Sequence, residues 1–203
     1  MRGLKGKRTI VTGGGSGIGR EVCKRFAEEG SEVAVFDINA AGATETVKII
    51  GDAGGKATAH AVDITERAAV DAAVAEVEKG GPINVLVNNA GWDVPRLFLE
   101  SDATLWKKVI DINLYGPLNM HHAVLPGMVR NGGGRVVNIS PDAGRVGSSG
   151  EAVYSACKGG IIAFTKTVAR ELARKGIQLN AVAPGPTDTP LFAEFSKGEG
   201  GEK

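Results

Sequence analysis

The 203-residue chain has few cysteines, no large excess of charge of either sign and no long hydrophobic run. Its two cysteines, Cys23 and Cys157, lie far apart in segments with a helical pattern, which argues against a disulfide framework or a zinc site. The 24 basic residues nearly balance the 23 acidic ones, so no nucleic-acid or membrane partner is indicated. No apolar stretch approaches the ~18 residues of a membrane span.

Metal-binding and export signals are also missing. The histidines His60, His121 and His122 have neither the spacing nor the neighbours of a metal-binding set, so no metal site is expected. A strand pattern begins within a few residues of the first methionine and leaves no room for the apolar segment of a secretion signal. Together these absences predict a cytoplasmic protein whose partner is a small molecule.

Short β-rich runs alternate with longer helical patterns along the chain, which is typical of βαβ units and a parallel sheet. Strands are expected at 7–12, 32–37, 56–62, 83–87, 134–140 and 177–183. Helices are expected at 18–29, 41–53, 65–79, 101–128 and 152–175, the fourth being two helices broken near Gly116 and Pro117. We therefore expect an α/β doubly wound Rossmann fold, with about six parallel strands and helices on both faces. A single domain would span 1–192, followed by a disordered tail at 193–203.

A glycine-rich segment, TGGGSGIG at 12–19, lies between the first expected strand and the first expected helix. Glycines there allow positive φ angles, bring backbone N–H groups close to a pyrophosphate and let the helix N-terminus approach it. The residues of this loop expected to bind a dinucleotide are Gly13, Ser16, Gly17, Ile18 and Gly19.

Asp37 stands at the end of the second expected strand, 18 positions after Gly19. A carboxylate at that spacing accepts hydrogen bonds from the adenosine ribose hydroxyls and repels a 2′-phosphate. Because no Arg or Lys lies within the glycine loop, the expected cofactor is NAD and not NADP. Asp63 and Ile64, after the third strand, are further cofactor-binding candidates. Asp63 is expected either to cap the next helix or to hydrogen-bond the adenine amino group.

Further motifs follow the glycine loop: NNAG at 88–91, Asn113, YSACK at 154–158, PG at 184–185 and Thr189. With this combination, over residues 4–192, the chain resembles the short-chain dehydrogenase/reductase family. Three segments, NNAGWDV, MHHAVLPGMV and RVGSSGEAVYSACKGG, are most similar within that family to dehydrogenases of 2-hydroxycyclohexanecarboxyl-CoA, which use NAD. The resemblance implies an NAD enzyme acting on a secondary alcohol, with an acyl-CoA thioester as substrate.

The resemblance also implies roles for individual residues. Asn113 would hold a water of a proton relay, and Asn89 and Gly91 would lie by the cofactor in the NNAG turn. The cofactor-binding residues after the last expected strand would be Pro184, Gly185, Thr187 and Thr189. Thr187 and Thr189 would approach the nicotinamide carboxamide. Other interpretations stay open, because asparagine is common in turns and Asn113 could be an ordinary polar residue inside a helix.

Tyr154 and Lys158 are four residues apart, so on a helix their side chains share one face. A phenol with a pKa of ~10 is a poor base at neutral pH, but a nearby ammonium and an oxidised nicotinamide favour the phenolate. We therefore expect Tyr154 to be the general acid/base and Lys158 to lower its pKa. By the resemblance, Lys158 also holds the nicotinamide ribose.

Pro141 stands 13 positions before Tyr154, where the family has a serine that polarises the substrate oxygen. Ser140 is the neighbouring catalytic candidate, although strand alternation should turn it away unless the strand end twists. Ser148 and Ser149 are alternative donors. Because losing one oxyanion donor costs about 10² to 10³ in turnover, we expect a slow or rerouted enzyme.

Three functions stay open from the sequence. The first is an NAD-dependent alcohol or hydroxyacyl-thioester dehydrogenase. The second is a 3-oxoacyl-thioester reductase, which shares the motifs but usually prefers NADPH. The third is an NAD-binding protein that has lost catalysis, which Pro141 and the short carboxyl end would favour.

The family resemblance implies two further features. Family members usually continue into a helical lid and a seventh strand, so both are expected to be missing here. Their subunits meet through the helices at 101–128 and 152–175, so a homodimer or homotetramer is expected.

Overall fold

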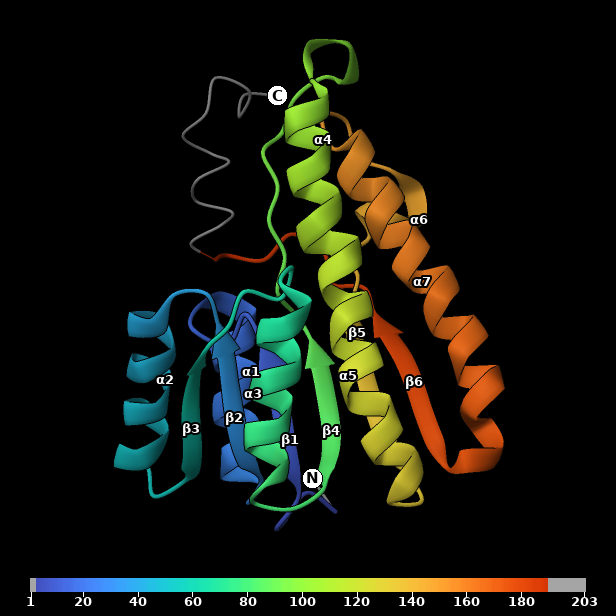
Figure 1. Ribbon diagram of the computed structural model, residues 1–203. Helices are drawn as coiled ribbons and strands as arrows, with labels where there is room; N and C mark the ends of the chain where they lie inside the picture. Colours follow the sequence, from blue (N-terminus) through green and yellow to red (C-terminus); the bar gives the residue numbers. More distant parts are fainter. Residues whose placement is uncertain (1–2, 190–203) are drawn as a thin grey trace.

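The computed structural model describes residues 3–189, and the expectations about the tail at 193–203 and the chain end concern residues outside this range. Six parallel strands form one sheet in the order β3-β2-β1-β4-β5-β6 (Figure 1). Their bounds are β1 Arg8–Thr12, β2 Glu32–Asp37, β3 Lys56–Ala61, β4 Ile83–Asn88, β5 Gly134–Ile139 and β6 Ile177–Val182. The doubly wound Rossmann fold and its six strands are confirmed.

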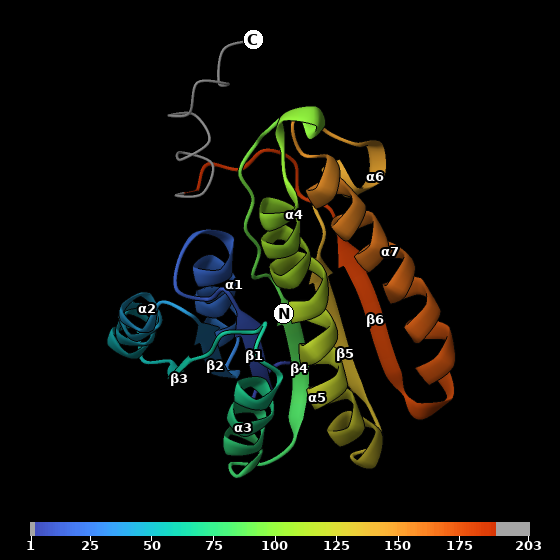
Figure 2. The ribbon, with the colours of Figure 1, turned by 45° about the horizontal axis from the view of Figure 1, so that its top comes forward.

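Helices cover both faces of the sheet (Figures 1 and 2). The bounds are α1 Gly17–Glu28, α2 Ala40–Asp52, α3 Arg67–Glu78, α4 Ala103–Ile110, α5 Gly116–Arg130, α6 Ala143–Val146 and α7 Ala152–Leu172. Ile10 of β1 packs in the core under α3 and α5, whereas its neighbour Val11 packs in the core under α1 and α2. Both side chains are fully buried, as expected of a parallel strand covered on both sides.

The order of the strands puts the functional segments together. The chain reverses its direction of winding between β1 and β4, which pair in parallel. Ligands of such sheets bind at this switch point, beyond the carboxyl ends of the strands. The glycine loop after β1 and the NNAG segment at the end of β4 therefore lie beside each other.

Two α-helices, α4 and α5, form here as predicted and the second begins at Gly116, but the chain between them is not broken. A π-helical turn, Asp111–Tyr115, joins α4 to α5, so the helical run continues from 103 to 130. The Gly116 N–H donates to the Asp111 carbonyl across the widened turn. Proline has no N–H to donate, and the wider turn lets the helix continue past Pro117 in spite of this. None of the helices within 3–189 combines the length and apolar character needed to cross a membrane.

A buried polar network joins the neighbouring strands β4 and β5 to α5 and α7 near the carboxyl ends of the two strands. Asn88 Nδ2 donates to Asn138 Oδ1 at 2.9 Å, and Asn138 Nδ2 lies 2.8 Å from Thr165 Oγ1 and 3.2 Å from His121 Nε2. The other ring nitrogen, Nδ1, lies 2.6 Å from the Pro117 carbonyl oxygen and so carries the proton. Burial lowers the pKa of His121 to about 4, although the Pro117 carbonyl opposes this, and the ring is neutral at pH 7.

Acid should destabilise the protein through His121. Its pKa is 6.5 when unfolded and about 4 when folded, so the unfolded chain binds the proton more tightly between those values. The free energy of unfolding should fall by roughly 3 kcal/mol from this residue as pH drops from 6.5 to 4. Urea titrations of His121→Gln should show a flatter pH dependence, whereas the exposed His122→Gln should keep the original one. Equal pH dependence in wild type and His121→Gln would contradict the assignment.

Candidate active site

The glycine loop leaves no room for side chains at two positions. Gly13 has φ +64°, and a Cβ there would lie 2.9 Å from the Cα of Ala90 in the NNAG segment. A Cβ on Gly19 would lie only 2.0 Å from the Gly13 carbonyl oxygen. The loop therefore packs directly against the start of α1 and against NNAG, as a close backbone approach to a ligand requires.

The N-terminus of α1 is open at the loop. Ser16 is the N-cap residue, is exposed, and its side chain makes no capping hydrogen bond. Gly17 and Ile18 begin the helix and are half-buried. Backbone N–H groups at such an end bind phosphate, and the helix dipole favours a negative charge there.

Asp37 is tied to the glycine loop. Its Oδ2 accepts a 2.8 Å hydrogen bond from the Gly15 N–H, and its Oδ1 accepts one of the same length from the Asn39 N–H. A carboxylate has about four acceptor sites, so further ones remain for hydroxyl groups of a ligand.

Arg20 bonds the same loop residue, Gly15, and the sequence analysis did not single it out because it follows the loop. Its guanidinium donates to the Gly15 carbonyl and to Glu45, so it is already paired.

Thr12 and Asn89 fasten the two loops together. Thr12 Oγ1 accepts hydrogen bonds from the Asn89 N–H at 3.0 Å and the Ala90 N–H at 3.1 Å. Asn89 Nδ2 in turn donates to the carbonyls of Thr12 and Gly13. The side chain of Asn89 thus has a positioning role at the switch point, where a cofactor would contact both loops.

The Asp63 carboxylate stabilises a local turn. Its Oδ1 accepts from both the N–H and the hydroxyl of Thr65, while α3 has Glu66 as its N-cap. The side chain of Ile64 is 8% exposed and packs in the core, close to Gly116. Asp63 therefore has polar side-chain atoms near the edge of the sheet, whereas the side chain of Ile64 is apolar and buried.

Asn113 lies in the π-helical turn and is fully buried. Its Nδ2 donates to the Trp92 carbonyl at 2.6 Å and to the Val109 carbonyl at 2.9 Å, and its Oδ1 accepts from the Trp92 N–H. A Cβ on Gly91 would be 3.0 Å from Asn113 Oδ1 and 3.3 Å from Lys158 Nζ. Asn113 therefore holds the segment after NNAG in place next to the lysine.

Tyr154 and Lys158 meet on α7 as predicted from their spacing. Lys158 Nζ lies 5.3 Å from the centroid of the Tyr154 ring and 3.5 Å from the Ile139 carbonyl oxygen. Burial lowers the pKa of Lys158 to about 8, although the charges of Cys157 and Asp93 oppose this.

The expected lowering of the pKa of Tyr154 is not found in this structure. Burial makes the largest contribution to raising this pKa, and the negative charges of Glu151, Asp93 and Cys157 raise it further. The phenol is therefore protonated at neutral pH.

The segment from Ser140 to Gly144 packs on α7. Ser140 is fully buried, and its hydroxyl donates to the Lys158 carbonyl at 2.7 Å. Strand alternation places the Ser140 side chain in the interface between the sheet and α7. The expectation that Ser140 serves as the catalytic hydroxyl is therefore corrected. Pro141 accepts a hydrogen bond from the Gly144 N–H, and a Cβ on Gly144 would lie 2.7 Å from Lys158. The alternative donors Ser148 and Ser149 are exposed.

The segment after β6 lies at the same end of the sheet. The Pro184 carbonyl accepts from the Asp142 N–H at 3.3 Å, which links it to the segment after β5. Gly185 and Thr187 are exposed, and the Thr187 hydroxyl donates to the Gly185 carbonyl at 3.0 Å. Thr189 is half-buried. Their approach to a nicotinamide stays a prediction.

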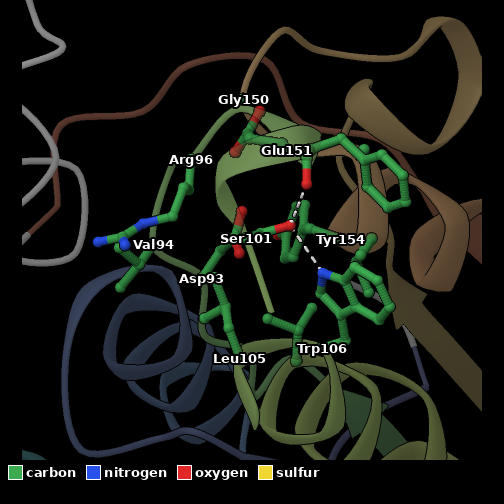
Figure 3. Close-up of a pocket in the computed structure, with 13 residues that line it drawn as sticks. Asp93, Val94, Arg96, Ser101, Leu105, Trp106, Gly150, Glu151 and Tyr154 are labelled. Carbon is green, nitrogen blue, oxygen red and sulfur yellow. Dashed lines mark hydrogen bonds between the residues drawn. The ribbon is translucent and has the colours of Figure 1, made fainter. Parts of the chain in front are cut away.

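A narrow pocket lies in front of Tyr154 (Figure 3). Its lining includes Asp93 and Ser101 from the segment after NNAG, Trp106 from α4, and Glu151 and Tyr154 at the start of α7. Ser101 Oγ donates to the Phe98 carbonyl and accepts from Trp106 Nε1, both at 2.7 Å. Sequence reasoning missed Asp93, although its position two residues after NNAG was a usable signal.

Comparisons with known proteins agree with this geometry. The protein-family model described as short chain dehydrogenase matches residues 7–200. A 3-oxoacyl-[acyl-carrier-protein] reductase of Thermotoga maritima is 39% identical over 189 residues, which make up 93% of this chain and 77% of the relative. The (3R)-3-hydroxyacyl-CoA dehydrogenase of Homo sapiens is 38% identical over 198 residues, covering 93% of this chain and 76% of the relative.

A solved structure is similar as well. The crystal structure of a 3-ketoacyl-(acyl-carrier-protein) reductase from Brucella melitensis complexed with NADH has a TM-score of 0.90 and 32% identity. The similarity covers 96% of this chain and 82% of that chain.

Removing the Thr12 hydroxyl should loosen the contact between the two loops. Thr12→Val leaves the N–H groups of Asn89 and Ala90 without their acceptor, which should cost about 2 kcal/mol of stability. Affinity for NADH should fall about tenfold. A misplaced NNAG segment that costs ~1.4 kcal/mol of binding free energy would change the Kd by that factor. Thr9→Val is the matched control, because Thr9 is equally buried at the other end of β1 and bonds Ser31. Fluorescence titration with NADH that finds the same affinity for both variants would contradict the proposed role of Thr12.

Proposed function

The chain belongs to the short-chain dehydrogenase family, and we propose that it transfers hydride between NAD and a secondary alcohol carried on an acyl thioester. Its family makes it an oxidoreductase that binds a nicotinamide cofactor. The finer proposal rests chiefly on one observation, the position of Lys158 Nζ 5.3 Å from the centroid of the Tyr154 ring. Both side chains lie on α7 at the carboxyl end of the sheet, on the same side as the glycine loop.

The residues at the glycine loop fit a dinucleotide. The loop is too tight for a Cβ at Gly13 or Gly19, and the N-cap side chain of Ser16 leaves the start of α1 uncapped. These features suit a pyrophosphate against backbone N–H groups. Asp37 beside the loop suits a ribose diol and repels a 2′-phosphate. Arg20, which could oppose that repulsion, is paired with Glu45, so the balance favours NAD.

When bound, the nicotinamide cofactor supplies or accepts the hydride. Tyr154 gives its hydroxyl proton to the substrate oxygen in the reducing direction and takes a proton from it in the oxidising direction. The raised pKa of Tyr154 keeps the phenol protonated at neutral pH, which suits proton donation. Oxidation requires added positive charge near the phenol, from Lys158 and from an oxidised nicotinamide.

The substrate class is supported by the surface next to the Tyr154 pocket. A wider groove of about 310 Å³ adjoins it. Its lining combines the apolar Val94 and Leu105, the cations of Arg96 and Lys108, Thr104, and Asp102, whose carboxylate caps the start of α4. Apolar and cationic side chains in one groove suit an acyl chain followed by an anionic carrier. Both relatives reported above act, by their names, on acyl thioesters.

A cyclic hydroxyacyl-CoA similar to 2-hydroxycyclohexanecarboxyl-CoA is proposed as the substrate, on the basis of the three resembling segments. The second candidate is a 3-oxoacyl-thioester reductase, which the protonated state of Tyr154 favours. Assembly into a homodimer or homotetramer, a cytoplasmic location and the domain bounds 1–192 stay predictions from the sequence.

Replacing the phenol should slow turnover strongly without loss of cofactor binding. Tyr154→Phe should lower kcat by about 10² to 10⁴, because the general acid/base is lost. The chain's second tyrosine, Tyr115, is 57% exposed, so Tyr115→Phe is the matched control and should keep the wild-type rate. Absorbance of NADH would be followed with 3-oxoacyl-CoA and cyclic 2-hydroxyacyl-CoA substrates. Turnover by Tyr154→Phe within twofold of wild type would refute the assignment. NADH binding without turnover on any alcohol or ketone would instead support a non-catalytic NAD-binding protein.

Asp37 should set the choice between NAD and NADP. Asp37→Asn should lower kcat/KM with NAD about tenfold and raise it with NADP, because the ribose acceptor and the repulsion of a 2′-phosphate are both weakened. Asp52→Asn is the control, because the Asp52 side chain is exposed at the end of α2, and it should leave both values unchanged. An unaltered ratio of the two cofactors in Asp37→Asn would overturn the proposal of NAD specificity.

A further inference from the structure

Asp93 is a buried carboxyl at the Tyr154 pocket. Asp93 is only 5% exposed, and its Oδ2 has no hydrogen-bond partner among residues 3–189. Buried polar atoms in folded proteins are nearly always paired, so an orphaned carboxyl oxygen calls for an explanation. Because Asp93 lines the pocket, a ligand oxygen in that pocket is a natural partner.

Apart from Tyr154 itself, other polar side chains around the site are engaged, except the buried Ser155 hydroxyl, which has no partner among residues 3–189 but does not line the pocket. Ser101 bonds Phe98 and Trp106, Ser140 bonds the Lys158 carbonyl, and Asn113 bonds the backbone of Trp92. Glu151 also lines the pocket but is less buried than Asp93. Within the described part of the chain, Asp93 is therefore the carboxyl of this pocket that is both buried and unpaired.

Most titratable groups around Asp93 lie on or next to α7. They are Glu151, the N-cap of that helix, and Tyr154, Cys157 and Lys158 within it. The α4 residues that line the pocket, Leu105, Trp106 and Val109, carry no charge, and the segment of Asp93 itself contributes Arg96. Burial raises the pKa of Asp93 to about 6, and Glu151 raises it as well, against the Val94 N–H and Lys158, which lower it. The carboxyl thus gains its proton at a pH that enzymes commonly experience.

We propose that the protonated Asp93 carboxyl donates a hydrogen bond to the substrate oxygen beside Tyr154, in place of the serine hydroxyl that Pro141 lacks. The inference rests on the proposed function, since it needs a substrate oxygen at Tyr154. Tyr154 passes its proton to that oxygen, while Asp93 keeps its own proton and stabilises the developing negative charge. A carboxylic acid held neutral by an apolar site acts in this way in ketosteroid isomerase.

Two substitutions at Asp93 separate hydrogen bonding from charge. Asp93→Leu, which has no donor, should lower kcat for ketone reduction about 10²-fold, while the Kd for NADH stays within about twofold. Asp93→Asn keeps an N–H donor and should stay within about tenfold of wild type. Asp52→Leu, at an exposed position of α2 away from the pocket, is the matched control and should keep the rate. Wild-type kcat in Asp93→Leu, or loss of NADH binding together with kcat, would overturn the proposal.

The pH profile tests the protonation state. In wild type, kcat for reduction should rise as pH falls from 8, reach half its limit near pH 6 and level off about one pH unit lower, because the donor form of Asp93 is the protonated one. Asp93→Asn should be flat over this range, and Glu151→Gln should shift the midpoint to lower pH. If Asp93→Asn had the same pH profile of kcat as wild type, the role of Asp93 as a protonated donor would be contradicted.

A second-site change tests whether Asp93 and the missing serine serve the same oxygen. Adding Pro141→Ser to Asp93→Leu should recover at least about tenfold of the lost rate. No recovery would contradict a shared role. A wild-type enzyme that binds NADH but reduces no ketone would refute the proposed function itself, which distinguishes that failure from a failure at Asp93.

Discussion

A lysine ammonium that is almost fully removed from water constrains the whole carboxyl end of this sheet. Lys158 is 3% exposed, and its Nζ lies near the Ile139 carbonyl and the ring of Tyr154. An ammonium in such a place needs close dipoles and π-electrons to offset its lost hydration. Gly91 and Gly144 supply that closeness, because a Cβ at either position would crowd Lys158. The glycines of NNAG and of PDAG are therefore explained by packing around the lysine as much as by any ligand.

The same burial couples three titrating groups. Asp93, Tyr154 and Lys158 share a region of low polarity, and each shifts in the direction that disfavours its charged form. Water normally screens such electrostatic interactions. Because these three groups are largely buried, a change of charge on a bound cofactor would shift the pKa of each of them. If the substrate oxygen binds beside Tyr154 as proposed, the proline at 141 removes one hydrogen-bond donor, and Asp93, Tyr154 and Lys158 remain around that position.

Much of this arrangement could be predicted from local sequence patterns. The six strands, the glycine loop and the pairing of Tyr154 with Lys158 follow from periodicity and spacing, because each depends on residues near one another in the chain. The burial of Asp93 could not be predicted, since it results from the packing of α4 and α7 over one segment. The raised pKa of Tyr154 has the same origin. The orientation of Ser140 could be predicted from strand alternation. The hydrogen bonds between Asn89 and Thr12 could not, because they depend on the pairing of strands that are distant in the sequence.

The π-helical turn at Asp111–Tyr115 has a consequence for how this helix can vary. One additional residue per turn rotates everything after it by about 100° relative to everything before it, because an α-helix has 3.6 residues per turn. Deleting a single residue there would restore a regular α-helix and change which side chains of the run face the sheet. Either Asn113 or the Met120 side of α5 would then leave its present contacts. The length of this helix is therefore tied to the alignment of its two halves, so an insertion or deletion at 111–115 would displace contacts on both sides of the turn, whereas a substitution would affect only one position.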